Sequence, residues 1–266
     1  MSPVDGTEPG AMFAEERQRA VVERLRSAGK VTVEELAAAF HVSAPTVRAD
    51  LARLEDRGLL RRTHGGAIRA DGTLFEPPYD QRQVMRHVEK RAIARAAAAR
   101  VKDGETVLLD AGTSSFEIAL LLKERAGLTI VTNSIANAVT LMENPALEVV
   151  LVGGSVQPRR RATLGPLAVG FLDRLCVDRA FLAFNGVHPE AGFTVVDFDA
   201  AEVKRRMMER ATETIAVADS DKIGRVAFAW AAPLSAARLL ITDSGIAEDD
   251  RARLTEKGLA VEIARV

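Results

Sequence analysis

Residues 32–51 read TVEELAAAFHVSAPTVRADL, and this stretch predicts two short helices joined by a tight turn. Thr32 is a typical N-cap residue and Glu35 follows it by three positions, so a helix is expected over residues 34–40. Ser43 is a second N-cap, and an apolar stripe at helical spacing follows it. Two capped helices this close together are typical of a helix-turn-helix, whose second helix fits the ~12 Å wide major groove of DNA.

The sequence on either side of this stretch completes a small domain. An apolar stripe at helical spacing predicts a first helix that starts at Ala14 and that Gly29 ends. The third helix is expected to end at Gly58, and residues 59–68 contain two short runs around a Gly-Gly turn, as a small hairpin does. Three helices and a wing result.

Composition and periodicity divide the chain into four parts. Residues 1–12 contain Pro, Gly and Asp without periodicity and predict a disordered leader. Residues 13–69 hold the winged helix-turn-helix domain, and residues 70–88, with two adjacent prolines and mixed charge, predict a linker. Residues 89–266 predict a second domain.

The second domain alternates short β-branched runs with amphipathic stretches. Its strand candidates are residues 106–109, 128–131, 149–152, 179–184, 214–218, 239–242 and 260–263. Its helical stretches are residues 90–101, 116–125, 135–142, 167–175, 199–211 and 248–257. This alternation implies right-handed crossovers, and therefore an α/β domain with a mainly parallel, Rossmann-like sheet and helices on its faces.

Composition also excludes several classes of protein. With 266 residues, 47% hydrophobic and 27% charged, the chain is of the globular class rather than disordered or fibrous. No uncharged apolar run approaches the ~18 to 20 residues that cross a bilayer, and no signal peptide is visible, so we expect no membrane segment and a cytoplasmic location. Cys176 is the single cysteine and the four histidines lie far apart, so we expect no disulfide, no metal site and no cofactor.

The exposed side of the third helix is the candidate DNA-binding surface. If Val47 and Leu51 face the core, the N-terminal half of this helix presents other side chains to base edges. The Ser43 hydroxyl and the free N–H groups of the helix start can bind a phosphate oxygen, and cations of the hairpin can reach the adjacent backbone. The candidate DNA-binding residues are Ser43, Ala44, Pro45, Thr46, Arg48, Arg53, Arg61, Arg62, His64, Gly65 and Gly66.

The net charge of −1 does not by itself indicate DNA as the partner. Between Phe13 and Ala70, 11 Lys and Arg residues stand against 8 Asp and Glu residues, a surplus of 3. The arginines can also form a solvated face that acids such as Glu34, Glu35 and Asp50 neutralise, and charge alone does not decide between the two interpretations. The helix spacing favours double-stranded DNA.

Polar or glycine-rich residues follow the ends of several predicted strands. Ligands bind outside the carboxyl ends of the strands in open parallel sheets, so these segments are expected to converge on one crevice. Gly112 allows close backbone approach, and the hydroxyls and N–H groups after it suit a phosphate, although Ser and Thr are also ordinary N-caps. The Lys222 ammonium, in a turn, can neutralise a phosphate. The candidate effector-binding residues are Asp110, Gly112, Thr113, Ser114, Ser115, Thr132, Asn133, Gly153, Gly154, Asn185, Gly186, Lys204, Asp219 and Lys222.

Two further features have open interpretations, and a third is expected to be structural. Lys204 is predicted on a helix, where an exposed charge and a ligand contact are equally plausible. Residues 159–161 are three arginines that form either a solvated loop, which we favour, or a basic flap over the crevice. Phe228 and Trp230 are expected to pack into the core.

The first domain also carries an extended pattern, made up of Arg17, Val21, Leu25, Ser43, Thr46, Val47, Arg48, Asp50 and Leu51. Together with the ending His64-Gly65-Gly66-Ala67, this pattern resembles the signature of the DeoR-type bacterial transcriptional regulators. The resemblance implies a winged helix-turn-helix that reads operator DNA, with the motif proper over residues 31–50. Asp50 is then expected to orient an arginine such as Arg53 or Arg48.

The resemblance extends to the second domain, because the C-terminal half of these regulators is similar to sugar-phosphate isomerases of the ribose 5-phosphate type. It implies a phosphorylated sugar bound at Asp110, Gly112, Thr113, Thr132, Asn133, Gly153, Gly154, Lys204 and Lys222. The isomerases carry the motif Asp-Gly-x-Asp, whereas the corresponding stretch here is Asn185-Gly186-Val187-His188. Because acid/base catalysis needs titratable carboxyls near the substrate, we expect ligand binding without turnover, with Glu202 as a remaining candidate base.

These patterns together predict a sequence-specific transcriptional regulator, and more narrowly a repressor of a carbohydrate-metabolism operon that a phosphorylated sugar controls. One small head buries little DNA surface, so we expect a homo-oligomer, a dimer or tetramer, that reads repeated half-sites. Two alternatives stay open at this point. One is a sugar-phosphate isomerase with an appended helix-turn-helix head, and the other is a metabolite-binding module whose head contacts protein.

Overall fold

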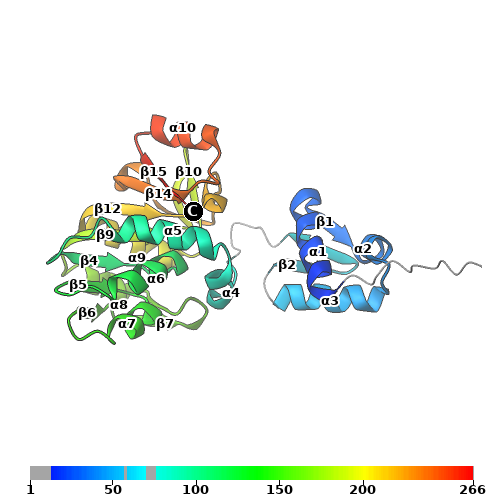
Figure 1. The fold of residues 1–266 in the computed structure, drawn as a ribbon, viewed down its shortest axis with the longest axis horizontal. Coiled ribbons are helices and arrows are strands. Elements are labelled where there is room, and N and C mark those ends of the chain that lie inside the picture. The colour runs from blue at the N-terminus through cyan, green and yellow to red at the C-terminus, as the bar shows by residue number, and fades with distance from the viewer. Residues whose placement is uncertain (1–12, 57–58, 70–75, 266) are drawn as a thin grey trace, which may run out of the picture. The chain divides into compact units, whose positions relative to one another are not determined.

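The chain divides between Gly72 and Thr73 into two units. The structure is a computed structural model that describes residues 13–56, 59–69 and 76–265, and Figure 1 shows both units. The expected leader over residues 1–12 and the expected helix end at Gly58 lie outside the described residues.

Three helices build the core of the smaller unit: α1 (Ala14–Ala28), α2 (Val33–Phe40) and α3 (Ala44–Asp56). A capping box starts α2, in which the Thr32 hydroxyl accepts from the Glu35 N–H and the Glu35 carboxylate accepts from the Thr32 N–H. Ser43 precedes α3, and its hydroxyl accepts from the Thr46 N–H at 3.3 Å. The apolar stripes of the helices meet in one core, whose buried members include Val21, Leu25, Leu36, Val47, Leu51 and Leu54.

A small antiparallel sheet completes this unit. β2 (Leu60–Thr63) and β3 (Gly66–Arg69) form the expected hairpin, and β1 (Lys30–Thr32), which no sequence pattern predicted, pairs with β3. Gly66 lies so close to β1 that a Cβ at this position would meet the Val31 carbonyl oxygen at 2.0 Å. Only glycine fits there, so Gly66 sets how closely the wing approaches β1.

Seven parallel strands form the main sheet of the larger unit, in the order β15-β14-β12-β9-β4-β5-β6 (Figure 1). They are β4 (Thr106–Leu109), β5 (Thr129–Thr132), β6 (Glu148–Leu151), β9 (Val177–Ala183), β12 (Ala211–Val217), β14 (Leu239–Asp243) and β15 (Ala260–Ala264). Each expected strand overlaps one of them, and every neighbouring pair is parallel. The expected fold class, a helix-turn-helix head followed by an α/β domain with a mainly parallel sheet, is confirmed.

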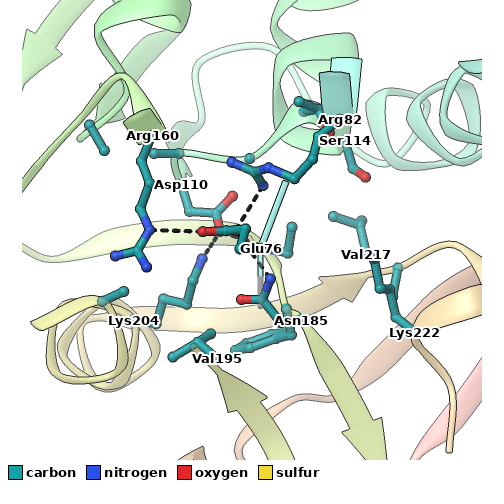
Figure 2. Close-up of a pocket in the computed structure, with 18 of the residues that line it drawn as sticks. Glu76, Arg82, Asp110, Ser114, Arg160, Asn185, Val195, Lys204, Val217 and Lys222 are labelled. Atoms are coloured by element: carbon teal, nitrogen blue, oxygen red, sulfur yellow. Dashed lines mark hydrogen bonds and ion pairs between the residues drawn. The ribbon is translucent and has the colours of Figure 1, made fainter. Parts of the chain in front are cut away.

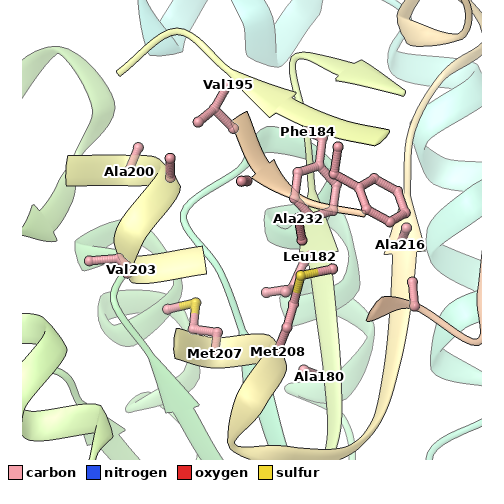
Figure 3. Packing of buried hydrophobic residues seen from close by; sticks show 14 of the residues in the cluster. Ala180, Leu182, Phe184, Val195, Ala200, Val203, Met207, Met208, Ala216 and Ala232 are labelled. Atoms are coloured by element: carbon pink, nitrogen blue, oxygen red, sulfur yellow. The ribbon is translucent and has the colours of Figure 1, made fainter. Parts of the chain in front are cut away.

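Helices cover both faces of this sheet. They are α5 (His87–Ala98), α6 (Thr113–Leu122), α7 (Ile135–Leu141), α8 (Pro166–Leu172), α9 (Phe198–Glu209) and α10 (Glu248–Glu256). Side chains alternate along each strand between two apolar clusters, so Val107 and Leu109 of β4 pack with α5 and α6, and Leu108 packs with α9. Figure 3 shows the second cluster, where α9 side chains such as Met207 face β9 side chains such as Leu182.

Short strands form two further sheets beside the main one. β10 (Gly186–His188), β11 (Gly192–Val195) and β13 (Ala229–Ala232) pair in an antiparallel manner. β7 (Ser155–Gln157) and β8 (Ala162–Leu164) form a hairpin around the 3-10 turn η1 (Pro158–Arg160). None of these five strands was predicted, because a run of three or four residues shows too little alternation to be recognised.

The expected linker over residues 70–88 is folded in its second half. α4 (Tyr79–Val84) lies there, and α5 begins at His87. Tyr79 is buried, and the Lys90 ammonium donates to two carbonyls at the end of α4. A six-residue helix shows fewer than two turns of period, so the sequence alone predicts a linker where a helix forms.

The strand order reverses between β4 and β9. From β4 the sheet grows through β5 and β6, and from β9 it grows in the opposite direction through β12, β14 and β15. In open parallel sheets such a reversal leaves a crevice outside the carboxyl ends of the two central strands. Asp110 follows β4 and Asn185 lies just beyond β9, so the topology places both at this crevice.

Candidate functional site

The head presents the N-terminal half of α3 to solvent. Pro45 and Arg48 are exposed, and Ala44 and Thr46 are partly exposed, whereas Val47 is buried in the core. The side of α3 expected to meet base edges is therefore its solvent side.

The cations near this surface are held in different ways. Arg48 and Arg53 are exposed and form no ion pair with any residue that the structure describes. Arg62 is bound to Glu55, with Arg62 Nε 2.6 Å from Oε2 and the Arg62 N–H donating to Oε1 at 2.9 Å. The backbone of Arg61 belongs to β2, and its side chain lies outside the described part of the structure.

The other candidate residues of the head are placed by local structure. Ser43 caps α3 and shares a hydrogen bond of 2.8 Å with the Thr46 hydroxyl. His64 and Gly65 form the exposed turn of the wing, whereas Gly66 is buried against β1. His64 and Gly65 are thus open to a partner, and Gly66 is fixed by packing.

Asp50 holds α3 against α1 instead of orienting an arginine on the solvent side. It is 3% exposed, its Oδ2 lies 2.5 Å from Arg17 Nε, and its Oδ1 accepts from Gln18 Nε2 at 3.0 Å. The expectation that Asp50 orients Arg53 or Arg48 is therefore wrong about the partner. A buried carboxylate needs a hydrogen-bonded cation, and Arg17 supplies it from the neighbouring helix.

A pocket lies at the strand reversal of the larger unit (Figure 2). Nine of the candidate effector-binding residues line it: Asp110, Gly112, Thr113, Ser114, Asn133, Asn185, Lys204, Asp219 and Lys222. They come from the ends of β4, β5, β9 and β12, from the start of α6, and from α9. Segments far apart in the sequence thus converge on one pocket.

Asp110 is the buried carboxylate in this pocket with the most contacts to its walls. It is 1% exposed, its Oδ2 accepts from the Ala183 N–H at 2.9 Å and from the Lys204 ammonium, and its Oδ1 accepts from the Ser115 hydroxyl. The Lys204 ammonium also lies over the Phe184 ring. Lys204 is therefore a pocket residue and not an exposed helix charge.

Positive charge is in excess in the pocket. Among the described residues, six cations and three carboxylates line it, namely Arg82, Arg86, Lys90, Arg160, Lys204, Lys222, Glu76, Asp110 and Asp219. Sequence reasoning missed Arg82, Arg86 and Lys90, which come from α4, from the residue before α5 and from α5. Arg160 belongs to η1 and reaches the pocket, so the preference for a solvated loop at residues 159–161 is wrong for this arginine.

Lys90 is a buried ammonium whose pKa lies below its ordinary value. It is 4% exposed and donates to the carbonyls of Arg82 and Met85, the latter at 2.7 Å. Burial lowers the pKa of Lys90 to about 8, and the positive charge of Lys222 acts in the same direction. A charge at this position therefore depends on pH in a range where arginine does not titrate.

Glu76 is a further pocket residue that no sequence signal indicated. Its Oε1 lies 3.0 Å from Arg82 Nη1 and accepts from Asn185 Nδ2 at 3.1 Å, and its Oε2 lies 2.9 Å from Arg160 Nε (Figure 2). Burial opposes the charge of this carboxylate, but Arg82 and Arg160, together with the Asn185 amide, outweigh burial and lower the pKa of Glu76. Glu76 is therefore ionised in the pocket.

Two buried acceptors in the pocket have no donor among the described residues. They are Asn133 Oδ1 and Asp219 Oδ1, on residues that are 3% and 4% exposed. Asn133 Nδ2 donates to the Thr163 carbonyl at 3.0 Å, which fixes the orientation of the amide. A buried acceptor without a donor costs about 1–3 kcal/mol, so each of these two oxygens favours a donor from a bound partner.

The other five candidate effector-binding residues do not line the pocket: Ser115, Thr132, Gly153, Gly154 and Gly186. The Thr132 hydroxyl accepts two hydrogen bonds from the start of α7. A Cβ at Gly154, whose φ is 145°, would meet a backbone oxygen at 2.7 Å, and one at Gly186 would meet a backbone oxygen at 2.4 Å. These positions shape the strand ends, and Gly153 is exposed.

The stretch that corresponds to the isomerase motif holds no acid or base at the pocket. His188 Nδ1 accepts from the backbone N–H groups of Glu190 and Ala191, at 3.1 and 3.2 Å, inside a turn. Glu202 pairs with Arg205 at the surface of α9 and does not line the pocket. Neither His188 nor Glu202 is placed for acid/base chemistry there.

No helix among the described residues combines the length and the apolar composition that a bilayer crossing needs. No group of three or more His, Cys, Asp and Glu side chains among them is arranged to hold a metal ion.

Family comparisons cover both units. Residues 17–73 match the DeoR-like helix-turn-helix domain, and residues 85–244 match the DeoR C terminal sensor domain. The HTH-type transcriptional regulator GlpR of Haloferax volcanii is 37% identical over 250 residues, which cover 94% of this chain and 98% of that protein. A putative aga operon transcriptional repressor of Escherichia coli O157:H7 is 33% identical and covers 92% of each chain.

A third relative, the HTH-type transcriptional repressor GlcR of Bacillus subtilis, is 34% identical over 87% of this chain and 89% of that protein. All three are named as regulators or repressors, so the prediction of a regulator rather than an enzyme is confirmed. With both domains matched and relatives similar along nearly their whole length, this chain belongs to the DeoR family of transcriptional regulators.

Proposed function

We propose that this regulator is a repressor that binds operator DNA through α3 and the wing, and that a phosphorylated sugar bound in the pocket of the sensor domain controls this binding. The observation that carries the proposal is the pocket itself. The pocket combines an excess of cations with buried acceptors that have no donor, and it lies in the part of the chain that matches the DeoR C terminal sensor domain.

The cations of the pocket are the reason that we propose a phosphate group on the ligand. Lys204 and Lys222 supply ammonium groups, and Thr113 and Ser114 bring the N–H groups and hydroxyls at the start of α6 to the same pocket. A helix start together with ammonium groups is a common phosphate site, because both present donors and positive charge to an anion.

The two buried acceptors without a donor are the reason that we propose a sugar as the other part of the ligand. Asn133 Oδ1 and Asp219 Oδ1 accept hydrogen bonds, so they select hydroxyl groups on the ligand. An inorganic anion alone would leave both unsatisfied. A phosphorylated polyol matches both halves of the pocket, whereas an unphosphorylated sugar matches only one.

The head supports repression by occupancy of an operator. Two of the three relatives named above are called repressors. Arg48 at base edges, with Ser43, Arg53, Arg61, Arg62 and the wing tip at phosphates, is the DNA contact that we propose. A single head of this size reads few base pairs, so we also propose a dimer or tetramer that binds repeated half-sites.

Thermal stabilisation of the full chain by a panel of sugar phosphates tests the effector. A ligand at about 100 times its dissociation constant adds about 2.7 kcal/mol to the free energy of unfolding. We expect this from a phosphorylated sugar and not from the same sugar without phosphate. Equal stabilisation by both would exclude the phosphate from recognition.

Paired substitutions place that effect in the pocket. Lys222→Ala removes a cation that lines the pocket, so stabilisation and ligand-dependent release from the operator are both expected to be lost, with basal operator binding retained. Lys257→Ala removes an exposed lysine that pairs with Glu190 outside the pocket, so both effects are expected to persist. Unchanged release in Lys222→Ala would refute the role of this pocket.

A further inference from the structure

The Glu76 carboxylate occupies an anion subsite inside the sensor pocket. Two guanidinium groups, of Arg82 and Arg160, and the Asn185 amide surround its two oxygens at 2.9 to 3.1 Å. The Glu76 side chain is 13% exposed, so these contacts form largely away from water. Guanidinium and amide donors at this distance suit a phosphate as well as a carboxylate.

An anionic ligand in this pocket therefore meets the negative charge of the Glu76 carboxylate. Glu76 and the ligand phosphate share the same cations, and like charges brought close together in a site of low dielectric disfavour one another. The ligand binds more strongly if the Glu76 carboxylate leaves Arg160 and Asn185. Arg160, on η1, and Asn185, beyond β9, are wall residues that stay when Glu76 leaves.

The position of Glu76 along the chain gives this competition a consequence. Glu76 precedes α4 and follows residues 70–75, which join the sensor domain to the head, whose last strand ends at Arg69. Pro77 and Pro78 lie between Glu76 and α4. Among the described residues, the Glu76 carboxylate thus makes the first polar contact of the sensor domain with the chain that leads from the DNA-binding head.

Other contacts hold α4 itself, and they do not involve the anion subsite. Arg161 Nη2 lies 2.5 Å from Asp80 Oδ1, and the Arg161 guanidinium lies over the Tyr79 ring. Lys90 binds the carbonyls at the end of α4. Loss of the Glu76 contact therefore leaves residues 76–78 held ahead of α4 by Arg82, whose Nε–H and N–H donate to the carbonyls of Pro77 and Pro78 at 3.1 and 3.0 Å.

We propose that Glu76 is an internal competitor of the effector: a phosphorylated ligand displaces its carboxylate from Arg160 and Asn185, and the displacement releases the segment that leads to the head. The proposal rests on the proposed function, because it assumes that the pocket binds a phosphorylated ligand. It adds the step that links occupancy of the pocket to the DNA-binding domain. The coupling is reciprocal. If operator binding requires the Glu76 carboxylate in its subsite, then operator binding weakens effector binding by the same factor by which the effector weakens operator binding.

Calorimetric titration of the full chain with inorganic phosphate tests the competition. In Glu76→Gln the subsite keeps its cations and loses the competing charge, so phosphate is expected to bind about tenfold more tightly than to the native chain. Glu190→Gln is the control, because it removes one negative charge from an exposed ion pair with Lys257 outside the pocket. We expect Glu190→Gln to bind phosphate as the native chain does.

A second readout follows the segment directly. The Arg82 N–H donates to the Pro78 carbonyl at 3.0 Å, and this hydrogen bond depends on residues 76–78 staying in place. Saturating phosphate is expected to speed hydrogen exchange at the Arg82 amide in the native chain. In Glu76→Gln the exchange should be fast without phosphate, and in Glu190→Gln it should respond to phosphate as in the native chain.

The outcomes separate this proposal from the proposed function. Equal or weaker phosphate binding by Glu76→Gln, with native binding intact, overturns the competition and leaves the sensor pocket in place. Phosphate binding by neither chain, with sugar phosphates also inactive, overturns the proposed function and the competition with it. Should Glu76→Gln fold poorly, Glu76→Asp is the substitute, because it keeps the charge on a shorter side chain. Its phosphate affinity is expected to lie between those of the native chain and Glu76→Gln. A phosphate affinity no higher than that of the native chain would count against competition.

Discussion

The DNA-binding head and the sensor pocket hold their positive charge in opposite ways. On the head, Arg48 and Arg53 are exposed and pair with no residue that the structure describes. In the pocket, Arg160 and Lys204 are largely buried and each already contacts a carboxylate. An exposed, unpaired cation is ready for the phosphates of DNA, whereas a paired cation must exchange partners before it binds a ligand. The two regions should therefore respond differently to salt, substitution and pH.

Salt is expected to produce the largest difference between the two regions. A protein that neutralises 6–10 phosphates loses about 10³–10⁵-fold in affinity between about 50 and 200 mM salt. The two heads of the proposed dimer, with their arginines, are expected to reach that number of contacts. Binding of inorganic phosphate in the pocket should weaken less than about tenfold over the same range, because partly buried charges are screened less. Fluorescence anisotropy with operator DNA and calorimetry with phosphate, on the same full-length preparation, measure the two slopes.

Equal salt slopes would remove the contrast. A flat operator curve would mean that the head does not dock on DNA through these arginines. A steep phosphate curve would mean that phosphate binds to exposed cations outside the pocket.

Substitution of single arginines on the head should have the next largest effect. Arg48→Ala is expected to cost about 1–3 kcal/mol at the preferred operator and to leave binding to unrelated DNA almost unchanged, because a base contact carries sequence information. Arg62→Ala should weaken binding to all sequences by a smaller and similar amount, since Glu55 already neutralises much of this charge. Affinities for a set of operator variants and for unrelated DNA separate the two patterns.

An exposed arginine of the sensor domain provides the control for net charge. Arg251 lies on α10 and pairs with Glu248 at the surface, so Arg251→Ala should leave operator affinity unchanged. If Arg48→Ala weakened binding to every sequence alike, its side chain would be a phosphate contact and the reading helix would need another base-contacting residue.

The sequence predicts the head and the main sheet well because both are built from repeated local signals. The N-caps at Thr32 and Ser43 form the hydrogen bonds that their positions predict. The seven strands of the main sheet are apolar runs between polar ends, and each was found within a few residues. Phe228 and Trp230, in contrast, are 46% and 57% exposed and do not pack into the core. Phe228 precedes the short edge strand β13 and Trp230 lies in it, and aromatic character alone does not say which side of such a strand a residue occupies.

The pocket was only half predictable for a related reason. Residues at strand ends, such as Asp110 and Lys222, follow from topology, since parallel strands deliver their carboxyl ends to one edge. Glu76, Arg82 and Arg160 reach the pocket from a segment without clear periodicity and from a hairpin turn. Their role arises from contacts between segments far apart in the chain, and a single sequence carries no local signal for such pairs.

The smallest expected difference between the two regions concerns pH, and it depends on Lys90. Its pKa in the folded chain is about 8, below the ordinary value of 10.5, so its ammonium is mostly charged near pH 7 and mostly neutral near pH 9. Anion binding in the pocket should therefore weaken as the pH rises through about 8, by roughly three- to tenfold. Sulfate is the suitable probe because its own charge is constant in this range. Operator binding should be flat over the same range, because arginine stays charged.

Lys90→Arg assigns this pH dependence to one side chain. The substitution keeps a positive charge at all the pH values used, so sulfate affinity should lose its decline across pH 8, while the native chain keeps it. Lys257→Arg, at an exposed lysine outside the pocket, should decline as the native chain does. A decline that persists in Lys90→Arg would assign the proton to another group, and the charge of the pocket would then be as constant with pH as that of the head.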